Sequence, residues 1–159
     1  MSKTLMAYAT RYGATAETAT TIADVLRDKY SLTVDVVDLI KERSVDLDQY
    51  QNIILGVSVA KFRWARRGVK FLKNDLTDKK FFVFVSSGTA GAAAEKNDME
   101  EYEKRQKKYI DDVLAKYNIQ PTARKAFGGR MQFGPEVTDN RNWDVIKAWA
   151  EEVGKLIKS

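Results

Sequence analysis

The chain has 159 residues with a formal net charge of +5, and it contains neither cysteine nor histidine. Disulfides, thiolate chemistry, imidazole acid–base catalysis and metal sites built on these two residue types are therefore excluded. The length predicts one domain over 1–159, and because the chain shows no membrane-spanning apolar run and no signal peptide, we expect a cytoplasmic protein.

The first predicted strand covers 4–9 and the first predicted helix covers 16–30, and the turn between them has the composition of a phosphate site. Thr10 and Thr15 supply hydroxyl groups, and Gly13 permits a tight turn. Free backbone N–H groups at a helix start, with the helix dipole behind them, favour a phosphate. The turn matches neither GxGxxG nor GxxxxGK[ST]. The alternative is a strand-to-helix turn capped by threonine, without a ligand. The candidate phosphate-binding residues are Thr10, Arg11, Tyr12, Gly13, Ala14 and Thr15.

The rest of the chain alternates between strand-like and helix-like patterns. Further strands are predicted over 33–37, 52–59, 80–86 and 122–127, and further helices over 64–74, 95–117 and 140–158, with one helical turn within 41–50. Five strands separated by helices imply parallel βαβ units with right-handed crossovers. The fold class is therefore α/β, a three-layer sandwich.

The loops after the third and fourth strands have the composition of ligand loops. The first loop carries two aromatic residues that could lie against a flat ring, and the second is small and polar, so that backbone amides can approach a ring edge. The candidates are Ser58, Val59, Ala60, Lys61, Phe62 and Trp64 in the first loop and Ser86, Ser87, Gly88, Thr89, Ala90 and Gly91 in the second. A response-regulator receiver is excluded, because the acidic pair and the phosphoacceptor aspartate that it needs are missing after the first and third strands.

A strongly basic segment follows the first of these loops. Residues 61–73 contain six cations and no acid. Helical spacing places four of them along one face, which could hold an anionic substrate, an acidic redox partner or a lipid surface: Arg63, Arg66, Arg67 and Lys70. A solvated face without a partner is the alternative, and nucleic acid is disfavoured because no nucleic-acid motif accompanies the charge.

The turn at 10–15 resembles the flavodoxin phosphate loop [ST]-x-T-G-x-T, with tyrosine at position 12 where the family usually has threonine. This resemblance covers essentially the whole chain. It implies FMN as the cofactor, a five-stranded parallel sheet of order 2-1-3-4-5, and a flavin held by the loops named above.

Several short segments resemble one branch of the flavodoxin family, the oxygen-independent protoporphyrinogen dehydrogenases. These segments are residues 9–15, 55–59 and 127–130, and Thr138-Asp139 with Asn142-Trp143. That branch carries a long insertion after the fifth strand, whereas this chain has only residues 130–137 there.

Three functions are left open by the sequence. The first is an FMN-dependent dehydrogenase or oxidoreductase for an anionic substrate, with protoporphyrinogen IX as the substrate that the resemblance suggests. The second is a non-enzymatic electron carrier between proteins. The third is a binding module that has lost its cofactor. No side chain is an obvious general acid or base, so in the first two the flavin carries the chemistry.

Overall fold

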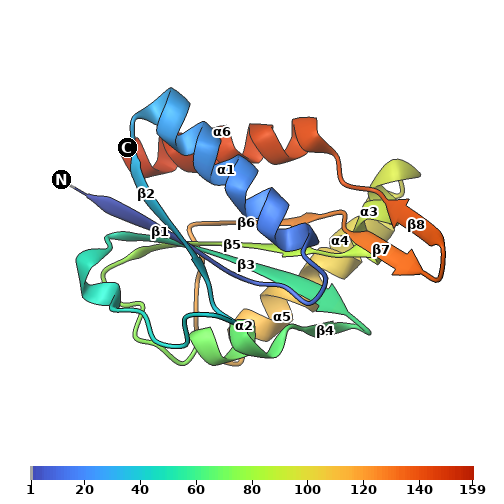
Figure 1. The fold of residues 1–159 in the computed structure, drawn as a ribbon, viewed down its shortest axis with the longest axis horizontal. Helices are drawn as coiled ribbons and strands as arrows, with labels where there is room; N and C mark the ends of the chain where they lie inside the picture. Colours follow the sequence, from blue (N-terminus) through green and yellow to red (C-terminus); the bar gives the residue numbers. More distant parts are fainter. Residues whose placement is uncertain (1) are drawn as a thin grey trace.

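The computed structural model of the chain describes residues 2–159, which are arranged around a central sheet (Figure 1). Five strands of this sheet run parallel, in the order β2-β1-β3-β5-β6. They are β1 (Lys3–Ala9), β2 (Thr33–Asp38), β3 (Asn52–Ala60), β5 (Lys80–Ser86) and β6 (Ala123–Phe127). The predicted fold class and the predicted strand order are both confirmed.

Helices cover both faces of the sheet, which gives the expected three layers (Figure 1). One face packs against α1 (Ala14–Tyr30) and α6 (Trp143–Lys158). The other face packs against α2 (Arg66–Phe71), α3 (Gly88–Glu95), α4 (Met99–Gln106), the π-helical segment η2 (Lys107–Asp111) and α5 (Asp112–Ala115). A single 3-10 turn, η1 (Leu47–Gln49), lies within the predicted range 41–50.

The central strand β5 shows why the sequence folds this way. Its side chains alternate between the two hydrophobic cores, with Phe81, Val83 and Val85 in one and Phe82 and Phe84 in the other. A parallel strand covered by helices on both faces needs such a continuous apolar run.

The predicted basic helix over 64–74 is shorter in the structure, because the chain first reverses direction. Lys61 and Phe62 both lie in the left-handed region, with φ of 51° and 64°. Two successive left-handed residues form the turn of a tight hairpin, whose returning strand is β4 (Arg63–Trp64), antiparallel to β3. Arg63 is therefore on a strand, and the prediction that it shares a helix face with Arg66, Arg67 and Lys70 was wrong.

The predicted helix over 95–117 is interrupted twice. At the first interruption, Asn97 lies just after the end of α3 and has a left-handed backbone with φ of 55°. The Asp98 side chain then caps α4 by accepting a hydrogen bond of 3.1 Å from the Glu101 amide. The second interruption is the π-helical segment η2, which directly follows α4. The short helix α3 starts inside the loop predicted over 86–91.

A second sheet is a hairpin that was not predicted. Its strands are β7 (Arg130–Phe133) and β8 (Glu136–Asp139), joined by a turn with Gly134 at φ of 61°. It follows β6, so it stands at the carboxyl edge of the main sheet (Figure 1).

The start of β1 and the end of α6 lie at the opposite, amino edge of the sheet (Figure 1). Lys3 opens β1, and Lys80, which opens β5, donates from Nζ to the Ser159 carbonyl oxygen at 3.2 Å. None of the helices formed by residues 2–159 has the length and apolar character needed to cross a membrane.

Candidate functional site

A cavity of about 440 Å³ lies at the carboxyl edge of the sheet. Its walls come from the carboxyl ends of β3 and β5, from the segments that follow β1, β3, β5 and β6, and from one residue of η2. The lining residues are Thr10, Tyr12, Ala14, Thr15, Ser58, Val59, Ala60, Lys61, Phe62, Ser86, Ser87, Gly88, Thr89, Tyr109, Gly129, Arg130, Met131, Gln132 and Phe133. The topology thus gathers ligand loops at the edge where open α/β sheets bind their ligands.

The start of α1 forms one end of this cavity. Gly13 takes the N-cap position with φ of 87°, and no side chain of residues 2–159 caps the helix. The Gly13 amide instead donates to Thr10 Oγ1 at 3.0 Å, which closes the turn. Thr15 Oγ1 is fully buried and has no hydrogen-bond partner among residues 2–159. A buried hydroxyl without a partner is costly, so this end of the cavity fits a ligand oxygen at a helix N-terminus.

The end of β5 and the start of α3 offer a second group of polar atoms. Ser86 Oγ is buried and, within the described chain, also lacks a partner. Ser87 caps α3 by accepting from the Ala90 amide at 3.2 Å, and Ser87 Oγ lies 3.1 Å from Thr89 Oγ1. Thr89 Oγ1 in turn lies 3.2 Å from the Tyr109 hydroxyl. A chain of hydroxyl groups therefore runs from the cavity wall to Tyr109.

The tip of the β3–β4 hairpin places an aromatic ring at the cavity mouth. Phe62 is 60% exposed, and two cations make cation–π contacts with its ring, Lys108 at 5.1 Å and Arg105 at 5.9 Å from the ring centroid. A bulky residue in the left-handed region is strained, and such strain is concentrated at functional sites. The turn therefore supplies the one expected aromatic of this loop that reaches the cavity.

Most of the predicted site residues lie together. Those that line the cavity are Thr10, Tyr12, Ala14 and Thr15, then Ser58, Val59, Ala60, Lys61 and Phe62, then Ser86, Ser87, Gly88 and Thr89. Those that do not line it are Arg11, Gly13, Trp64, Ala90 and Gly91. Arg11 connects two loops instead, since its amide donates to Ser58 Oγ at 3.1 Å and its guanidinium donates to the Trp64 carbonyl oxygen at 3.2 Å.

Trp64 is the main correction among the predicted site residues. It is 5% exposed and packs in the hydrophobic core, and its Nε1 donates to the Tyr109 carbonyl oxygen at 2.6 Å. The hairpin turn points Trp64 inward and Phe62 outward, a reversal that helical spacing did not anticipate. Trp64 therefore supports η2 and does not face a ligand.

Replacing Trp64 by phenylalanine is expected to destabilise the protein by about 1–3 kcal/mol, because the buried Tyr109 carbonyl loses its donor. The matched control is Trp149→Phe, since Trp149 is 3% exposed and its Nε1 lacks a partner within residues 2–159. Urea unfolding followed by circular dichroism measures both variants. Equal losses in the two would contradict the importance of the Trp64 hydrogen bond.

Six lining residues were not among the predicted site residues. They are Tyr109 from η2 and Gly129, Arg130, Met131, Gln132 and Phe133 from the segment after β6. The latter five follow the fifth parallel strand, and position at a carboxyl edge is the signal that could have identified them. Tyr109 was hidden within an apparently regular charged helix.

Asn140 connects the loop after β6 to the start of α3 by hydrogen bonds. Its side chain is buried, accepting from the Gly129 amide at 2.9 Å and donating to the Gly88 carbonyl oxygen at 2.8 Å. Its own amide donates to the Gly129 carbonyl oxygen at 3.1 Å. The loop after β6 and the start of α3 are therefore held at a fixed distance.

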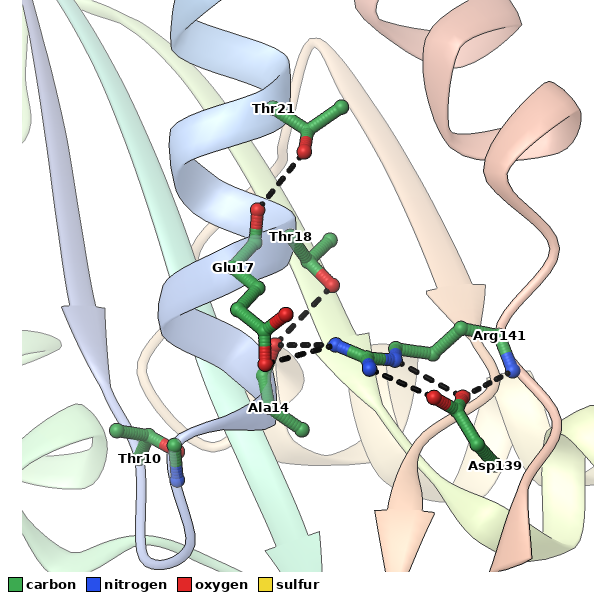
Figure 2. A network of polar contacts seen from close by, with 8 residues as sticks. Thr10, Ala14, Glu17, Thr18, Thr21, Asp139 and Arg141 are labelled. Atoms are coloured by element: carbon green, nitrogen blue, oxygen red, sulfur yellow. Dashed lines mark hydrogen bonds and ion pairs between the residues drawn. The ribbon is translucent and has the colours of Figure 1, made fainter.

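Arg141 connects the hairpin β7–β8 to the start of α1 (Figure 2). Its side chain is 4% exposed and reaches from the end of β8 to the Ala14 carbonyl oxygen, at 3.3 Å. On the way it pairs with Asp139 at 2.7 Å and with Glu17 at 3.6 Å. Figure 2 shows the guanidinium between Asp139 and the first turn of α1. One buried side chain thereby joins the hairpin β7–β8 to the start of α1.

Asp139→Asn is expected to cost stability near neutral pH and much less in acid. Hydrogen bonds from Arg141 hold the pKa of the Asp139 carboxyl below its ordinary value of 3.8. A carboxyl whose pKa is lower in the folded state than in the unfolded state adds stability at pH values above the unfolded-state pKa. This stability is lost as the pH falls through the folded-state pKa. The wild type and the variant are compared by urea unfolding near neutral pH and at about pH 3. A difference of the same size at both pH values would contradict the ionic role of Asp139.

Comparisons with known proteins agree with this geometry. A family model described as a flavodoxin domain matches residues 5–134. The oxidised flavodoxin 1 of Bacillus cereus is similar in structure, with a TM-score of 0.62 and 22% identity over 97% of this chain and 98% of that one. The flavodoxin of Streptococcus pneumoniae TIGR4 gives a TM-score of 0.62 and 18% identity over 97% and 99%. Rubredoxin oxygen:oxidoreductase from Desulfovibrio gigas gives a TM-score of 0.64 and 15% identity, over 98% of this chain and 36% of that one. No curated protein sequence matches the chain.

Proposed function

Because the chain belongs to the flavodoxin domain family, an FMN-binding fold, we propose that it is an FMN-dependent oxidoreductase for an anionic substrate. The observation that carries the proposal is one cavity that combines buried hydroxyls, which have no hydrogen-bond partner among residues 2–159, with a cationic and apolar outer wall. The hydroxyls fit a flavin phosphate and ring, and the outer wall fits a substrate beside them.

The residues present fit FMN at both ends of the cavity. At the phosphate end, Thr15 and the free N–H groups of α1 would hold the phosphate, next to the turn closed by Thr10. At the other end, Ser86 Oγ is a further buried hydroxyl able to hydrogen bond with a ring edge. Bound FMN supplies electron or hydride transfer, which the side chains of this chain do not perform. The protein contributes binding, orientation and electrostatics.

The outer wall supports an anionic substrate. Lys61 and Arg130 line it as cations, and Phe62, Met131 and Phe133 line it as apolar side chains. An arginine can pair with a carboxylate through two parallel hydrogen bonds, while the apolar groups contact a flat body. Protoporphyrinogen IX, suggested by the sequence resemblance, combines these two properties and is the first substrate to test. In this chain the short hairpin β7–β8 stands where the dehydrogenases of that branch carry their long insertion.

An electron carrier between proteins is the second candidate. Three aromatic side chains at the cavity are strongly exposed, with Tyr12 at 73%, Phe62 at 60% and Phe133 at 69%. Exposed aromatic groups around a cofactor cavity suit contact with a redox partner as well as contact with a small molecule.

An anaerobic mixing experiment separates the candidates. The protein is first loaded with FMN and its visible absorption is recorded, and protoporphyrinogen IX is then added without oxygen. Conversion of protoporphyrinogen to protoporphyrin removes six electrons, whereas each bound FMN accepts two, so an artificial electron acceptor is added in a second mixing experiment. Loss of the oxidised-flavin absorption on first mixing, and formation of protoporphyrin once the acceptor is present, support the dehydrogenase. Absence of flavin reduction by protoporphyrinogen overturns that substrate, and reduction only by a partner protein supports the carrier. A colourless protein that takes up no added FMN overturns both.

A further inference from the structure

A second, smaller cavity of about 140 Å³ lies away from the first and shares no lining residue with it. It is formed between α2 and the segment that follows β2. The lining residues are Leu39, Arg43, Ser44, Val45, Arg67, Lys70, Phe71 and Asn74. Arg67 and Lys70 belong to the predicted basic face, whereas Arg43 comes from a distant part of the sequence. Arg66 is on α2 but does not line this cavity.

Within the described residues, the cations of this cavity are not neutralised by an acidic side chain. None of the lining residues is acidic, and Arg43, Arg67 and Lys70 form no ion pair within residues 2–159. Repulsion first from Arg67, then from Arg66, and to a smaller extent from Arg43 lowers the pKa of the Lys70 ammonium. Like charges that converge without compensation are unfavourable, and an anion between them removes that cost.

The other walls suit a small oxyanion on an organic molecule. Ser44 contributes a hydroxyl, and the guanidinium groups of Arg43 and Arg67 present paired donors for tetrahedral oxyanions. The floor is apolar, since Leu39 and Phe71 are 6% and 5% exposed. Three cations match a dianionic phosphate better than a single carboxylate.

We propose that Arg43, Arg67 and Lys70 form a second anion site, which binds the phosphate group of a small soluble phosphorylated molecule. This site is separate from the FMN cavity and does not depend on the function proposed above. A lipid headgroup presents the same phosphate chemistry and is distinguished by the experiment.

Titration calorimetry of the FMN-loaded protein with inorganic phosphate and with pyrophosphate tests the proposal. Because FMN already occupies the start of α1, the heat released on adding phosphate comes from binding in the second cavity. We expect saturable binding with one site per chain. Arg67→Gln is expected to weaken it by about tenfold or more, because paired hydrogen bonds to the oxyanion are lost.

Arg66→Gln is the matched control. It removes the same charge from the same helix, but Arg66 does not line the cavity. We expect Arg66→Gln to change the affinity for the anion only about twofold, because salt and water screen the field of an exposed charge outside the site. Equal weakening by both substitutions, or no saturable binding by the wild type, overturns the proposal. Lys70→Gln is a second test, and thermal unfolding of all three variants shows that they remain folded.

Two further measurements separate the alternatives. In the first, the Thr15→Val variant is titrated with pyrophosphate without FMN. Binding that still depends on Arg67 supports the second site even if the chain proves not to bind FMN. In the second, the protein is sedimented with vesicles of phosphatidylcholine containing phosphatidic acid. Arg67-dependent sedimentation without binding of soluble phosphate overturns the small-molecule proposal in favour of a lipid surface.

Discussion

Replacing Thr15 by valine is expected to lower the affinity for FMN by roughly 10- to 100-fold, the effect of one lost hydrogen bond to a charged phosphate. Valine keeps the shape of threonine and removes only the hydroxyl. The Thr15 hydroxyl is buried at the first turn of α1 and has no partner within residues 2–159, so the folded protein loses no internal hydrogen bond. The unliganded variant should therefore be as stable as the wild type or slightly more stable.

Thr18→Val is the matched control for this experiment. Thr18 is on the same helix and is equally buried, but its hydroxyl donates to the Ala14 carbonyl oxygen at 3.3 Å. It does not line the cavity, so its loss should leave FMN affinity nearly unchanged. Flavin fluorescence titration gives the affinity, and thermal unfolding of the unliganded proteins gives the stability. An FMN affinity that is the same in the Thr15 and Thr18 variants would contradict the assignment of the phosphate end.

Replacing Gly128 by alanine is expected to cost roughly 2–4 kcal/mol of stability, from overpacking and broken hydrogen bonds. A Cβ at Gly128 would lie 2.2 Å from the Asn140 carbonyl oxygen and 2.6 Å from its Oδ1. Asn140 would have to move, and its movement breaks the hydrogen bonds that join Gly129 to Gly88 through its side chain.

The neighbouring residue provides the control for Gly128. A Cβ at Gly129 would meet its nearest atoms at 3.5 Å or more, which is ordinary contact, so Gly129→Ala should change stability by less than about 1 kcal/mol. Urea unfolding of both proteins without FMN measures the difference. If Gly128→Ala is as stable as Gly129→Ala, the close approach of Asn140 does not fix this loop.

The sequence was sufficient for the parts of the fold that depend on local pattern. The apolar run of β5 and the turn at residues 10–15 have compositions that few other structures would satisfy, and both were predicted with nearly correct bounds. Alternation of strands and helices then fixed the parallel sheet, because crossover connections allow few arrangements. The expectation of a single domain and of a cytoplasmic location stays a prediction.

The parts that could not be predicted depend on contacts between distant segments. The hairpin turn at Lys61 and Phe62 uses left-handed residues that the usual turn signals of glycine and asparagine do not indicate. The inward position of Trp64 follows from that turn and from a partner, Tyr109, that lies on η2. Arg43 and Arg67 line one cavity because α2 lies beside the segment after β2, and no local pattern in either segment indicates this arrangement.

The position of the two termini has a practical consequence. The start of β1 and the end of α6 both lie at the amino edge of the sheet, where Lys80 donates a hydrogen bond to Ser159, while the large cavity lies at the carboxyl edge (Figure 1). A linker attached at either end therefore leaves the cavity mouth facing the solution. Protein tethered to an electrode through one end would present the rim formed by Tyr12, Phe62 and Phe133 to whatever is dissolved above it. The flavin current could then be recorded with candidate substrates and partner proteins in turn on the same immobilised sample.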